Sequence, residues 1–359
     1  MNPVRDSLFV LIIAGGRGTR FWPRSRRHTP KQCLPVGGDH SLLEATIRRV
    51  KHVVPSERIL VITAADMAES VRQHVLDLPD ENVLVEPEGR NTAPCVGWGA
   101  VEVRRRAGGA SAVMAVLPAD HLITQEQSFV EQLEACASAA QETQALVTIG
   151  VPPDRPETGF GYLKVGEVEG SWGGSQFLRV DQFVEKPDRA TAEHYLESGA
   201  YLWNAGMFVF SSEAVEKAFQ DFLPESWSVL QQLGKQPNRV DELYPLLEKI
   251  SFDYGIMERS EHVCTVRAKF DWSDVGSWTA LGEHLPDTEV GQALATGVVG
   301  VRAERNVVYA PGKTVAMIGV SDLVVVDTGD AILICRKSDA QSVKEVVSEL
   351  ERRGETELL

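Results

Sequence analysis

The sequence predicts an α/β protein with a doubly wound, mostly parallel sheet, followed by a small β-rich C-terminal domain. Short apolar runs of strand length alternate with segments of helical spacing over the first half of the chain. These runs are almost continuously apolar, which is typical of parallel strands covered by helices on both faces. After residue 290 the pattern changes to short β-prone runs separated by turn residues. We therefore expect two domains, at residues 1–290 and 291–359.

The expected elements follow in chain order. Five strands are expected in the first half, at residues 8–14, 58–63, 82–86, 112–117 and 145–150. Helices are expected between them, at residues 41–54, 66–78, 92–106 and 128–141. The first of these helices opens with the capping box Ser41-Leu42-Leu43-Glu44. Longer strands at 162–168 and 177–185 come next, with helices at 188–198 and 212–222.

The C-terminal domain is expected to contain five short strands and one helix. The strands are expected at residues 295–301, 307–309, 314–318, 323–326 and 331–335. The helix is expected to start at a second capping box, at Ser338, and to end near Gly354. A domain this small is better suited to packing or assembly than to catalysis.

Composition and charge exclude several classes of protein. The 359 residues are 43% hydrophobic and 24% charged, which excludes wholesale disorder and a fibrous fold. A net charge of −15 argues against a general nucleic-acid or anionic-membrane partner. Five scattered cysteines without a C-x-x-C pair argue against a disulfide framework or zinc site. They fit a reducing cytoplasm, which is the expected location. No apolar run approaches the ~20 residues of a membrane helix.

A glycine-rich loop follows the first strand, as Ala14-Gly15-Gly16-Arg17-Gly18-Thr19-Arg20. Glycines at this point allow backbone N–H groups to approach a phosphate closely. The loop completes neither a Walker motif nor the dinucleotide fingerprint. From residue 15 to residue 38 the chain carries no acid and six basic residues, Arg17, Arg20, Arg24, Arg26, Arg27 and Lys31. In so acidic a protein this run indicates a polyanion site, and a solvated basic loop is the alternative.

The loop is part of a wider resemblance. Residues 11–23 (LIIAGGRGTRFWP), with Pro30-Lys31-Gln32, resemble the signature of the sugar-1-phosphate nucleotidylyltransferase family, and more narrowly its mannose-1-phosphate guanylyltransferase branch. Further blocks match in order at 86–94 (EPEGRNTAP), 117–121 (LPADH), 159–162 (GFGY), 183–187 (FVEKP), 203–208 (WNAGMF) and 274–278 (DVGSW). The blocks span nearly the whole chain, with Phe21 as a mild departure where the family often has Leu. The resemblance implies a Rossmann-like, nucleotide-diphospho-sugar transferase fold.

The resemblance also implies where the nucleotide binds. Four loop residues would lie against it, namely Ala14, Gly15, Gly16 and Gly18. Three more would line a guanosine pocket, namely Glu86, Asn91 and Thr92. Arg20 and Lys31 would stabilise the triphosphate and the leaving pyrophosphate. On the residues alone, Asn91 and Thr92 are equally well explained as a helix N-cap, and both roles can coexist.

Two aspartates are implied as ligands of Mg²⁺. Asp120 directly follows a predicted strand, and Asp274 lies in a turn flanked by tryptophans. Magnesium is commonly held by one or two carboxylates together with substrate phosphate oxygens. Without the family match, an Asp after a strand is more often a helix N-cap. Asp271 is a near neighbour, but Asp274 occupies the D-x-G-[ST]-W position.

The second half of the chain would bind the sugar phosphate. Glu185 and Asn204 would bind sugar hydroxyls, Lys186 would contact the phosphate, and Gly159 would allow close backbone approach. Successive strand side chains point to opposite faces, so the strand must end or bend at Glu185 for Lys186 to reach the same ligand. Pro187 supplies that break. An exposed ion pair is the alternative for Glu185 and Lys186. Three tryptophans are expected to pack around this site, Trp203, Trp272 and Trp278.

The implied reaction transfers GMP from GTP to α-D-mannose 1-phosphate, giving GDP-mannose and pyrophosphate. The sugar phosphate is already largely dianionic, so it can attack the α-phosphorus in line, with Mg²⁺ assisting and without a general base. One alternative is another sugar-1-phosphate nucleotidylyltransferase that uses glucose 1-phosphate with UTP or dTTP. A second is a non-catalytic nucleotide-sugar sensor on the same fold. A homo-oligomer, a dimer, is also expected.

Overall fold

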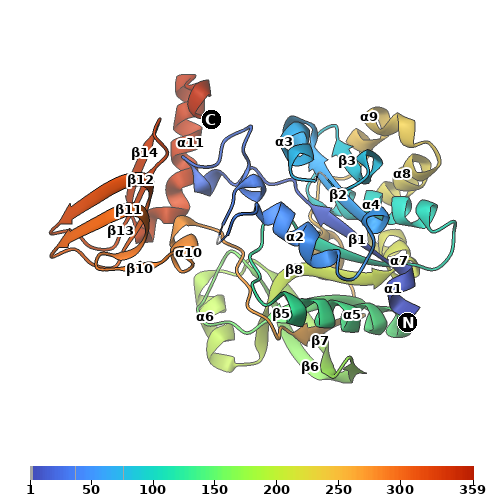
Figure 1. Cartoon of the computed structure of the whole chain (residues 1–359). Helices are drawn as coiled ribbons and strands as arrows, with labels where there is room; N and C mark the ends of the chain where they lie inside the picture. The colour runs from blue at the N-terminus through green and yellow to red at the C-terminus, as the bar shows by residue number, and fades with distance from the viewer. Residues whose placement is uncertain (1–2, 37, 76) are drawn as a thin grey trace.

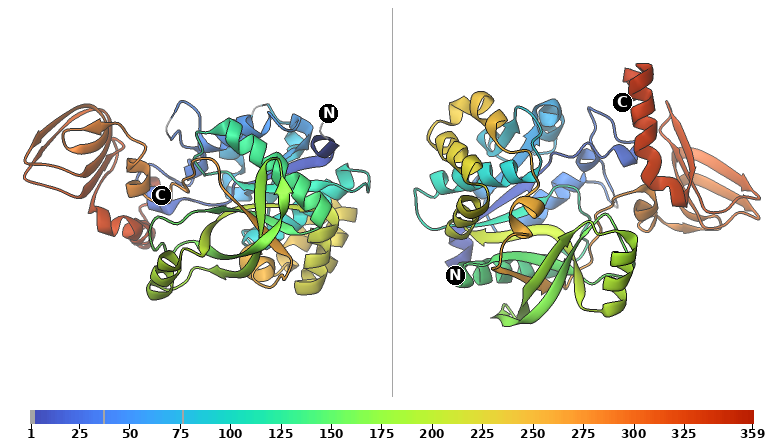
Figure 2. Two further views of the ribbon diagram at one scale, coloured as in Figure 1. Left: turned by 90° about the horizontal axis from the view of Figure 1, so that it is seen from below. Right: turned by 180° about the vertical axis from the view of Figure 1, so that it is seen from behind.

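The computed structural model describes residues 3–36, 38–75 and 77–359 and contains two sheets in that part of the chain. The larger sheet has nine strands in the order β3-β2-β1-β4-β8-β5-β9-β7-β6, and the smaller has five in the order β10-β11-β12-β13-β14. The smaller sheet and helix α11 form a unit at one end of the molecule (Figure 1), and two further views show it projecting from the larger body (Figure 2). This arrangement confirms the predicted fold class.

The strands and helices have the following bounds. The strands are β1 (Leu8–Ile13), β2 (Ile59–Ala64), β3 (Val83–Glu86), β4 (Val113–Pro118), β5 (Leu146–Val151), β6 (Gly161–Trp172), β7 (Ser175–Glu185), β8 (Tyr201–Ser211), β9 (Val263–Arg267), β10 (Asp287–Thr288), β11 (Gly291–Val301), β12 (Asn306–Ile318), β13 (Leu323–Asp327) and β14 (Ile332–Arg336). The helices are α1 (Pro3–Ser7), α2 (Leu42–Val50), α3 (Ala68–Gln73), α4 (Thr92–Arg106), α5 (Glu126–Thr143), α6 (Arg189–Ser198), α7 (Ser212–Phe222), α8 (Pro224–Lys235), α9 (Val240–Leu243), α10 (Trp278–Gly282) and α11 (Val343–Arg353). Among these described helices, none is both long enough and apolar enough to cross a membrane.

Helices cover both faces of the larger sheet because its first strand is apolar on both faces. Strands β3, β2, β1 and β4 are parallel neighbours. Val10 and Ile12 of β1 belong to a core shared with α2 and α5. Leu11 belongs to a second core, shared with α4, α7 and α8. The parallel register brings the carboxyl ends of these four strands to one edge of the sheet, where ligands bind in such folds.

Strand β8 is the main element that the sequence patterns did not predict. It lies between β4 and β5 and is antiparallel to both, while β9 is parallel to β5. Every residue of β8 except Gly206 is buried, so no alternation of polar and apolar side chains marks it as a strand. Its position carries Asn204 into the middle of the sheet.

Two predicted helices differ from the expectation. The helix expected at 66–78 is the shorter α3, preceded by a 3₁₀ turn at Ala65–Met67, and residue 76 of that range lies outside the described residues. The expected start of the last helix at Ser338 is wrong. The Ser338 hydroxyl bonds to the Asp339 side chain instead of capping a helix, within the 3₁₀ segment Lys337–Ser342. Helix α11 begins at Val343 and ends at Arg353, with Gly354 as its C-cap, close to the expected end.

The smaller sheet winds through parallel neighbours. Strand β12 pairs in parallel with β11 and with β13, while β10 and β14 pair antiparallel at the two edges. The two short strands expected at 307–309 and 314–318 are one continuous strand, β12. The strand runs through Pro311 and Gly312, where the sequence indicated a turn.

The segment after the glycine-rich loop is anchored on the smaller sheet. Trp278 packs against Phe21 and against Tyr309 of β12, and its indole N–H donates to the Trp22 carbonyl at 3.0 Å. The Trp22 indole and the Arg26 guanidinium both donate to the Leu358 carbonyl, at 2.8 and 2.7 Å. Trp278 therefore packs at this junction and not around the sugar site.

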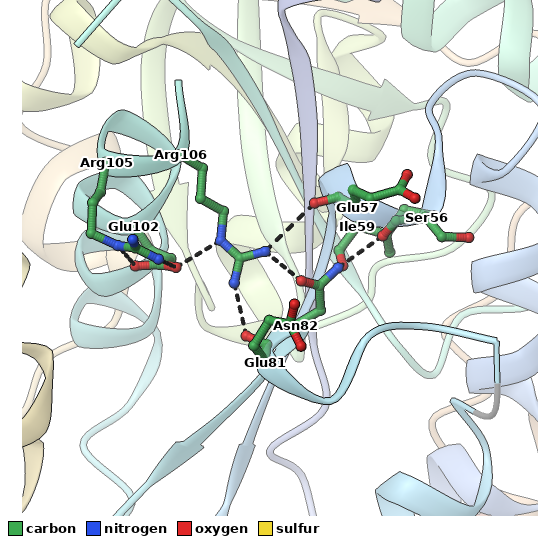
Figure 3. Close-up of polar contacts among 8 residues, drawn as sticks. All are labelled: Ser56, Glu57, Ile59, Glu81, Asn82, Glu102, Arg105 and Arg106. Carbon is green, nitrogen blue, oxygen red and sulfur yellow. Dashed lines mark hydrogen bonds and ion pairs between the residues drawn. The ribbon is translucent and has the colours of Figure 1, made fainter. Parts of the chain in front are cut away.

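A polar network anchors the end of α4 that lies away from the sheet's ligand edge (Figure 3). Arg106 donates to Glu102 at 2.6 Å, to the Glu81 carbonyl at 2.7 Å and to the side chain of Asn82. The Asn82 amide in turn donates to the carbonyls of Ser56 and Ile59, each at 2.8 Å. With its far end bound to the strands in this way, α4 presents its N-terminus at a defined place on the ligand edge.

Candidate active site

A cavity of about 410 Å³ opens at the carboxyl ends of β1, β3 and β4. Seven of the residues predicted from the sequence line it, namely Ala14, Gly15, Gly16, Glu86, Asn91, Thr92 and Asp120. Gly206 and Phe208 of β8 close another part of the wall. Residues from seven separate segments meet in this cavity, and the parallel strands contribute to it because they end at the same edge.

Glycine is required in the loop where it approaches Lys31. Gly18 has a φ of +62°, and a Cβ added to it would lie 2.3 Å from the Cβ of Lys31. Gly16 differs, because an added Cβ there would meet no atom within 4 Å. Gly18 thus allows Lys31 to lie against the loop, while Gly15 and Gly16 face the cavity.

Lys31 joins the two predicted metal ligands. Its ammonium, on a residue only 5% exposed, donates to Asp120 Oδ2 at 2.7 Å and to the Asp274 carbonyl oxygen at 2.5 Å. The segments that carry the aspartates are themselves paired, through backbone bonds of 2.9 and 3.0 Å between Leu122 and Ser273. Two turns far apart in the sequence are thereby brought to one cation.

The two aspartates have opposite electrostatic environments. Burial alone would raise the pKa of Asp120, but the Lys31 ammonium holds it below the ordinary carboxyl value. Burial raises the pKa of Asp274, and the nearby Asp120 carboxylate adds to that rise against the effect of Lys31. Lys31 occupies one oxygen of Asp120, and the Gly276 N–H donates to one oxygen of Asp274 at 3.2 Å. Within the described residues, the second oxygen of each carboxylate therefore accepts no hydrogen bond.

Two neighbouring residues have other roles. Asp271 accepts hydrogen bonds from the backbone N–H groups of Thr124 and Gln125, at 3.0 and 2.8 Å, and so holds the two residues that precede α5. Burial lowers the pKa of His121 to about 4, and its Nδ1 accepts from the Trp272 indole at 3.1 Å. His121 is thus a neutral packing residue at neutral pH. In the described part of the chain, no three His, Cys, Asp or Glu side chains gather into a cluster that could hold a metal.

Glu86 lies 3% exposed in the wall of the cavity. Its Oε1 accepts hydrogen bonds from the Tyr244 hydroxyl and from the Cys95 thiol, the latter at 3.2 Å. Its Oε2 faces the loop, since a Cβ added to Gly15 would lie 3.8 Å from it. Burial raises the pKa of Glu86, although both hydrogen bonds favour the ionised form. Tyr244 and Cys95 were not predicted from the sequence.

Asn91 is the N-cap of α4 and Thr92 is its first residue, and both line the cavity. Asn91 has a φ of +68° and accepts from the Thr92 N–H at 2.9 Å. The Thr92 hydroxyl accepts from the Phe252 N–H at 2.8 Å. The N-cap interpretation is correct for Asn91 but not for Thr92, and both residues lie in the cavity wall.

The four predicted sugar-side residues lie outside the lining of this cavity. Strand β7 ends at Glu185, and Lys186 has a φ of +50°, so the backbone turns where Pro187 predicted a break. The turn lets the Lys186 ammonium pair with the Glu185 carboxylate. Gly159 donates its N–H to Glu157 at 3.1 Å. Trp203 and Trp272 both pack edge-on against Phe160, close to these residues.

Asp253 links this sugar-side group to the cavity, and no sequence motif pointed to it. It lies in the π-helical turn Asp253–Met257 and lines the cavity. Its Oδ1 accepts from the Asn204 amide at 3.0 Å. Burial raises the pKa of Asp253 to about 7, with Glu185 adding to the rise and Lys186 opposing it.

Arg20 contrasts with these buried groups. It lies in the 3₁₀ turn Thr19–Phe21 and is exposed. Within the described residues its guanidinium has no ion pair or hydrogen bond, whereas Arg17 in the same loop pairs with Asp66 at 2.6 Å.

Comparisons with known proteins identify the family of the chain. The Nucleotidyl transferase family model matches residues 9–290, and the model of the MannoseP isomerase/GMP-like beta-helix domain matches residues 296–350. Mannose-1-phosphate guanylyltransferase of Escherichia coli (strain K12) is 37% identical over 98% of this chain and 75% of its own length. Xanthan biosynthesis protein XanB of Xanthomonas campestris pv. campestris (strain B100) has the same identity and coverage.

Two solved structures are also similar. A Thermus thermophilus protein named mannose-1-phosphate geranyltransferase superposes with a TM-score of 0.86 at 38% identity, covering 96% of this chain and 99% of that one. A Helicobacter pylori mannose-6-phosphate isomerase, 22% identical with a TM-score of 0.59, covers 74% of this chain and 99% of its own and shares the fold. The chain therefore belongs to the nucleotidyl transferase family and is a sugar-1-phosphate nucleotidyltransferase.

Proposed function

We propose that this enzyme transfers GMP from GTP to α-D-mannose 1-phosphate, forming GDP-mannose and pyrophosphate. The observation that carries the proposal is the buried Glu86 carboxylate in the cavity wall, with Oε1 held by Tyr244 and Cys95 and Oε2 facing the loop. Guanine presents two adjacent donors, N1–H and N2–H, which suit one carboxylate. Uracil and thymine present one N–H between two carbonyl oxygens, which a carboxylate repels. The names of the relatives support the same substrates.

The phosphate chain would lie along the glycine-rich loop. Gly15 and Gly16 leave room for backbone N–H groups to approach phosphate oxygens. Arg20 is exposed and has no ion-pair partner among the described residues, so it can bind the triphosphate without first breaking an ion pair. Lys31 is fixed by two hydrogen bonds and adds a preorganised positive charge where negative charge develops on the leaving pyrophosphate.

Asp120 and Asp274 would hold a Mg²⁺ ion. The pair fits such an ion because each carboxylate has one oxygen without a hydrogen-bond partner among the described residues. Burial and the Asp120 charge also disfavour the ionised form of Asp274 and raise its pKa, and a bound cation would favour that ionised form. When bound, the ion would neutralise charge on the phosphate oxygens. The protein's own part is to place two carboxylates and one ammonium beside the phosphates, so that the sugar phosphate can attack the α-phosphorus in line.

The mannose 1-phosphate would bind where β7 ends. Lys186 would contact its phosphate, Glu185 and Asn204 its hydroxyls, and Gly159 would lie against it. The turn at Lys186 supports this placement, because it brings the carboxylate and the ammonium together. We further propose that the domains divide at residue 290, that the enzyme acts in the cytoplasm, and that it forms a homodimer.

Pyrophosphate release tests the proposal. With GTP and Mg²⁺, release should begin only when mannose 1-phosphate is added, and GDP-mannose should appear in equal amount by mass spectrometry. Release without a sugar phosphate would contradict transfer, because water would then be the acceptor. Tight binding of GDP-mannose without release from any nucleotide and sugar-phosphate pair would favour the non-catalytic sensor.

A further inference from the structure

Most of the hydrogen-bonding capacity of the Asn204 side chain is used within the protein. Its Oδ1 accepts from the Thr148 hydroxyl at 2.9 Å and from the Gly206 N–H at 3.2 Å. Its Nδ2 donates to Asp253 Oδ1 at 3.0 Å. An amide oxygen has two acceptor positions and an NH₂ group has two hydrogens, so only one N–H remains for a ligand. Asn204 can donate to a sugar hydroxyl, but another residue must accept.

Asp253 has the position and the chemistry to be that acceptor. It lines the cavity, and Asn204 engages one of its two oxygens. The turn that carries it is anchored, because the N–H of the preceding Phe252 donates to Thr92 at 2.8 Å. Two groups assigned to the sugar phosphate interact with it electrostatically, the Glu185 carboxylate and the Lys186 ammonium. Asp253 therefore lies between the nucleotide cavity and the sugar-side residues.

We propose that Asp253 is a specificity-determining residue that accepts a hydrogen bond from one hydroxyl of the sugar phosphate, and that Asn204 is the positioning residue that aims it. The inference rests on the proposed function, since it takes a hexose 1-phosphate as the substrate. The two side chains are hydrogen-bonded to each other at 3.0 Å, and within the described residues Asp253 Oδ2 and the second N–H of Asn204 have no other hydrogen-bond partner. Together they present an acceptor and a donor to neighbouring hydroxyls, so a sugar that lacks the matching hydroxyl leaves a buried carboxylate unpaired.

The charges around Asp253 agree with this role. Burial raises its pKa to about 7, with the Glu185 carboxylate adding to the rise and Lys186 opposing it. Two further titratable groups lie near the pair, Tyr254, whose hydroxyl donates to the Glu185 carbonyl at 3.4 Å, and Glu258, which accepts from the Glu185 N–H at 2.7 Å. Because burial disfavours the ionised form of Asp253, a hydrogen bond from a substrate hydroxyl would stabilise that form.

The test compares Asp253→Ala, Asp253→Asn and Asn204→Ala with wild type, using mannose 1-phosphate and its 2-, 3- and 4-deoxy analogues. Asp181→Asn is the matched control, because this exposed carboxylate on β7 pairs with Arg179 away from the cavity. We expect Asp253→Ala to lower kcat/KM for mannose 1-phosphate by roughly 10- to 100-fold. The Kd for GTP alone, measured by calorimetry, should stay within about twofold, since base and phosphate contacts remain.

The analogue series provides the decisive readout. With wild type, kcat/KM for one deoxy analogue should be roughly 10-fold or more below kcat/KM for mannose 1-phosphate. With Asp253→Ala, the two values should be equal. Asp253→Asn should also lose the discrimination, because Asn204 holds its one amide oxygen and an NH₂ group replaces the oxygen that would accept from the sugar. Asn204→Ala should weaken the discrimination of the same analogue and of no other.

Three results would overturn the proposal. The first is an Asp253→Ala variant that discriminates every analogue as wild type does. The second is lost discrimination between GTP and dGTP, which would assign Asp253 to the ribose. The third is an Asp253→Ala variant in which kcat/KM falls by the same factor for all sugars and GTP binds more weakly, which would show a structural role. Failure of the proposed function is measured separately, as a higher kcat/KM of wild type for glucose 1-phosphate than for mannose 1-phosphate. In that case the deoxy analogues of glucose 1-phosphate replace those of mannose 1-phosphate.

Discussion

The Lys31 ammonium donates to the Asp120 carboxylate and to the Asp274 carbonyl oxygen, at 2.7 and 2.5 Å. One buried cation thus connects the turn after β4 with the turn before α10. The contact fixes the Asp120 carboxylate, which lines the cavity, next to the turn that carries Asp274 before any ligand arrives, which avoids reorganisation during the reaction. Gly18 makes the contact possible, because any side chain at that position would collide with Lys31.

Replacing either aspartate should remove most of the turnover. Asp120→Asn and Asp274→Asn each delete a negative charge from the proposed Mg²⁺ site, so kcat should fall sharply and should not recover at saturating Mg²⁺. Asp271→Asn is the control, since Asp271 accepts hydrogen bonds from the Thr124 and Gln125 N–H groups just before α5. It should lower the free energy of unfolding by about 1 kcal/mol and leave kcat nearly unchanged. Wild-type kcat in an Asp120 or Asp274 variant would remove that residue from the site.

Arg20→Ala and Lys31→Ala should lower kcat more than they raise KM for mannose 1-phosphate, because the charge they meet develops on the triphosphate. Loss of one preorganised electrostatic contact costs about 2.7–4 kcal/mol, or roughly 10²–10³-fold in kcat. Arg27→Ala serves as the control, since Arg27 is exposed and faces Glu351 of α11 at 3.9 Å. An effect confined to the sugar-phosphate KM would assign both residues to the other substrate.

Much of the fold could be predicted from the sequence because its signals are local, and the residues that the resemblance implies for the nucleotide include several that the structure gathers around one cavity. Asp120 and Glu86 follow or end apolar strands, and parallel strands bring such residues to one edge. Strand β8 was not predicted, because Asn204 and Gly206 interrupt its apolar run and its antiparallel direction depends on distant pairing with β4 and β5. Its position in the sheet is what brings Asn204 to Asp253.

The residues that support Glu86 and Asn204 also escaped prediction. Tyr244 contacts Glu86 across 158 positions of sequence, from a short turn without a motif. Asp253 contacts Asn204 across 49 positions, from a π-helical turn. Only the folded chain places these partners together, so nothing in the local pattern distinguishes them from surface residues.

We expect the Glu86 carboxylate to accept a hydrogen bond from the 2-amino group of guanine. Wild type should use GTP better than ITP, which lacks that group, and Glu86→Gln should reduce the ratio of their kcat/KM values. Tyr244→Phe deletes the hydroxyl that holds Glu86 and should raise KM for GTP by roughly 2- to 10-fold, from the loss of one hydrogen bond. Trp98→Phe, which keeps a ring against Tyr244 but touches no polar atom of Glu86, is the control. An unchanged GTP/ITP ratio in Glu86→Gln would assign base recognition elsewhere.

The pKa of Asp253 predicts a pH-dependent stability difference. A carboxyl whose pKa is about 7 in the folded protein and about 4 in the unfolded chain binds its proton more tightly when folded. Its contribution therefore destabilises the folded protein as pH rises from about 4 to about 7. Asp253→Asn should raise Tm relative to wild type more at pH 8 than at pH 5, as measured by scanning calorimetry. A difference in Tm that is constant with pH would show that this carboxyl does not titrate as described.

A single competition reaction tests the central claim most directly. The enzyme receives equal concentrations of GTP, ATP, UTP, CTP and dTTP, with mannose 1-phosphate and glucose 1-phosphate in equal amounts and Mg²⁺ present. Mass spectrometry quantifies the nucleotides, and chromatography against standards separates the two hexose epimers, so the initial product ratios equal ratios of kcat/KM. The account predicts GDP-mannose as the main product, with the guanine preference larger than the preference for mannose. UDP-glucose or dTDP-glucose as the main product would contradict it.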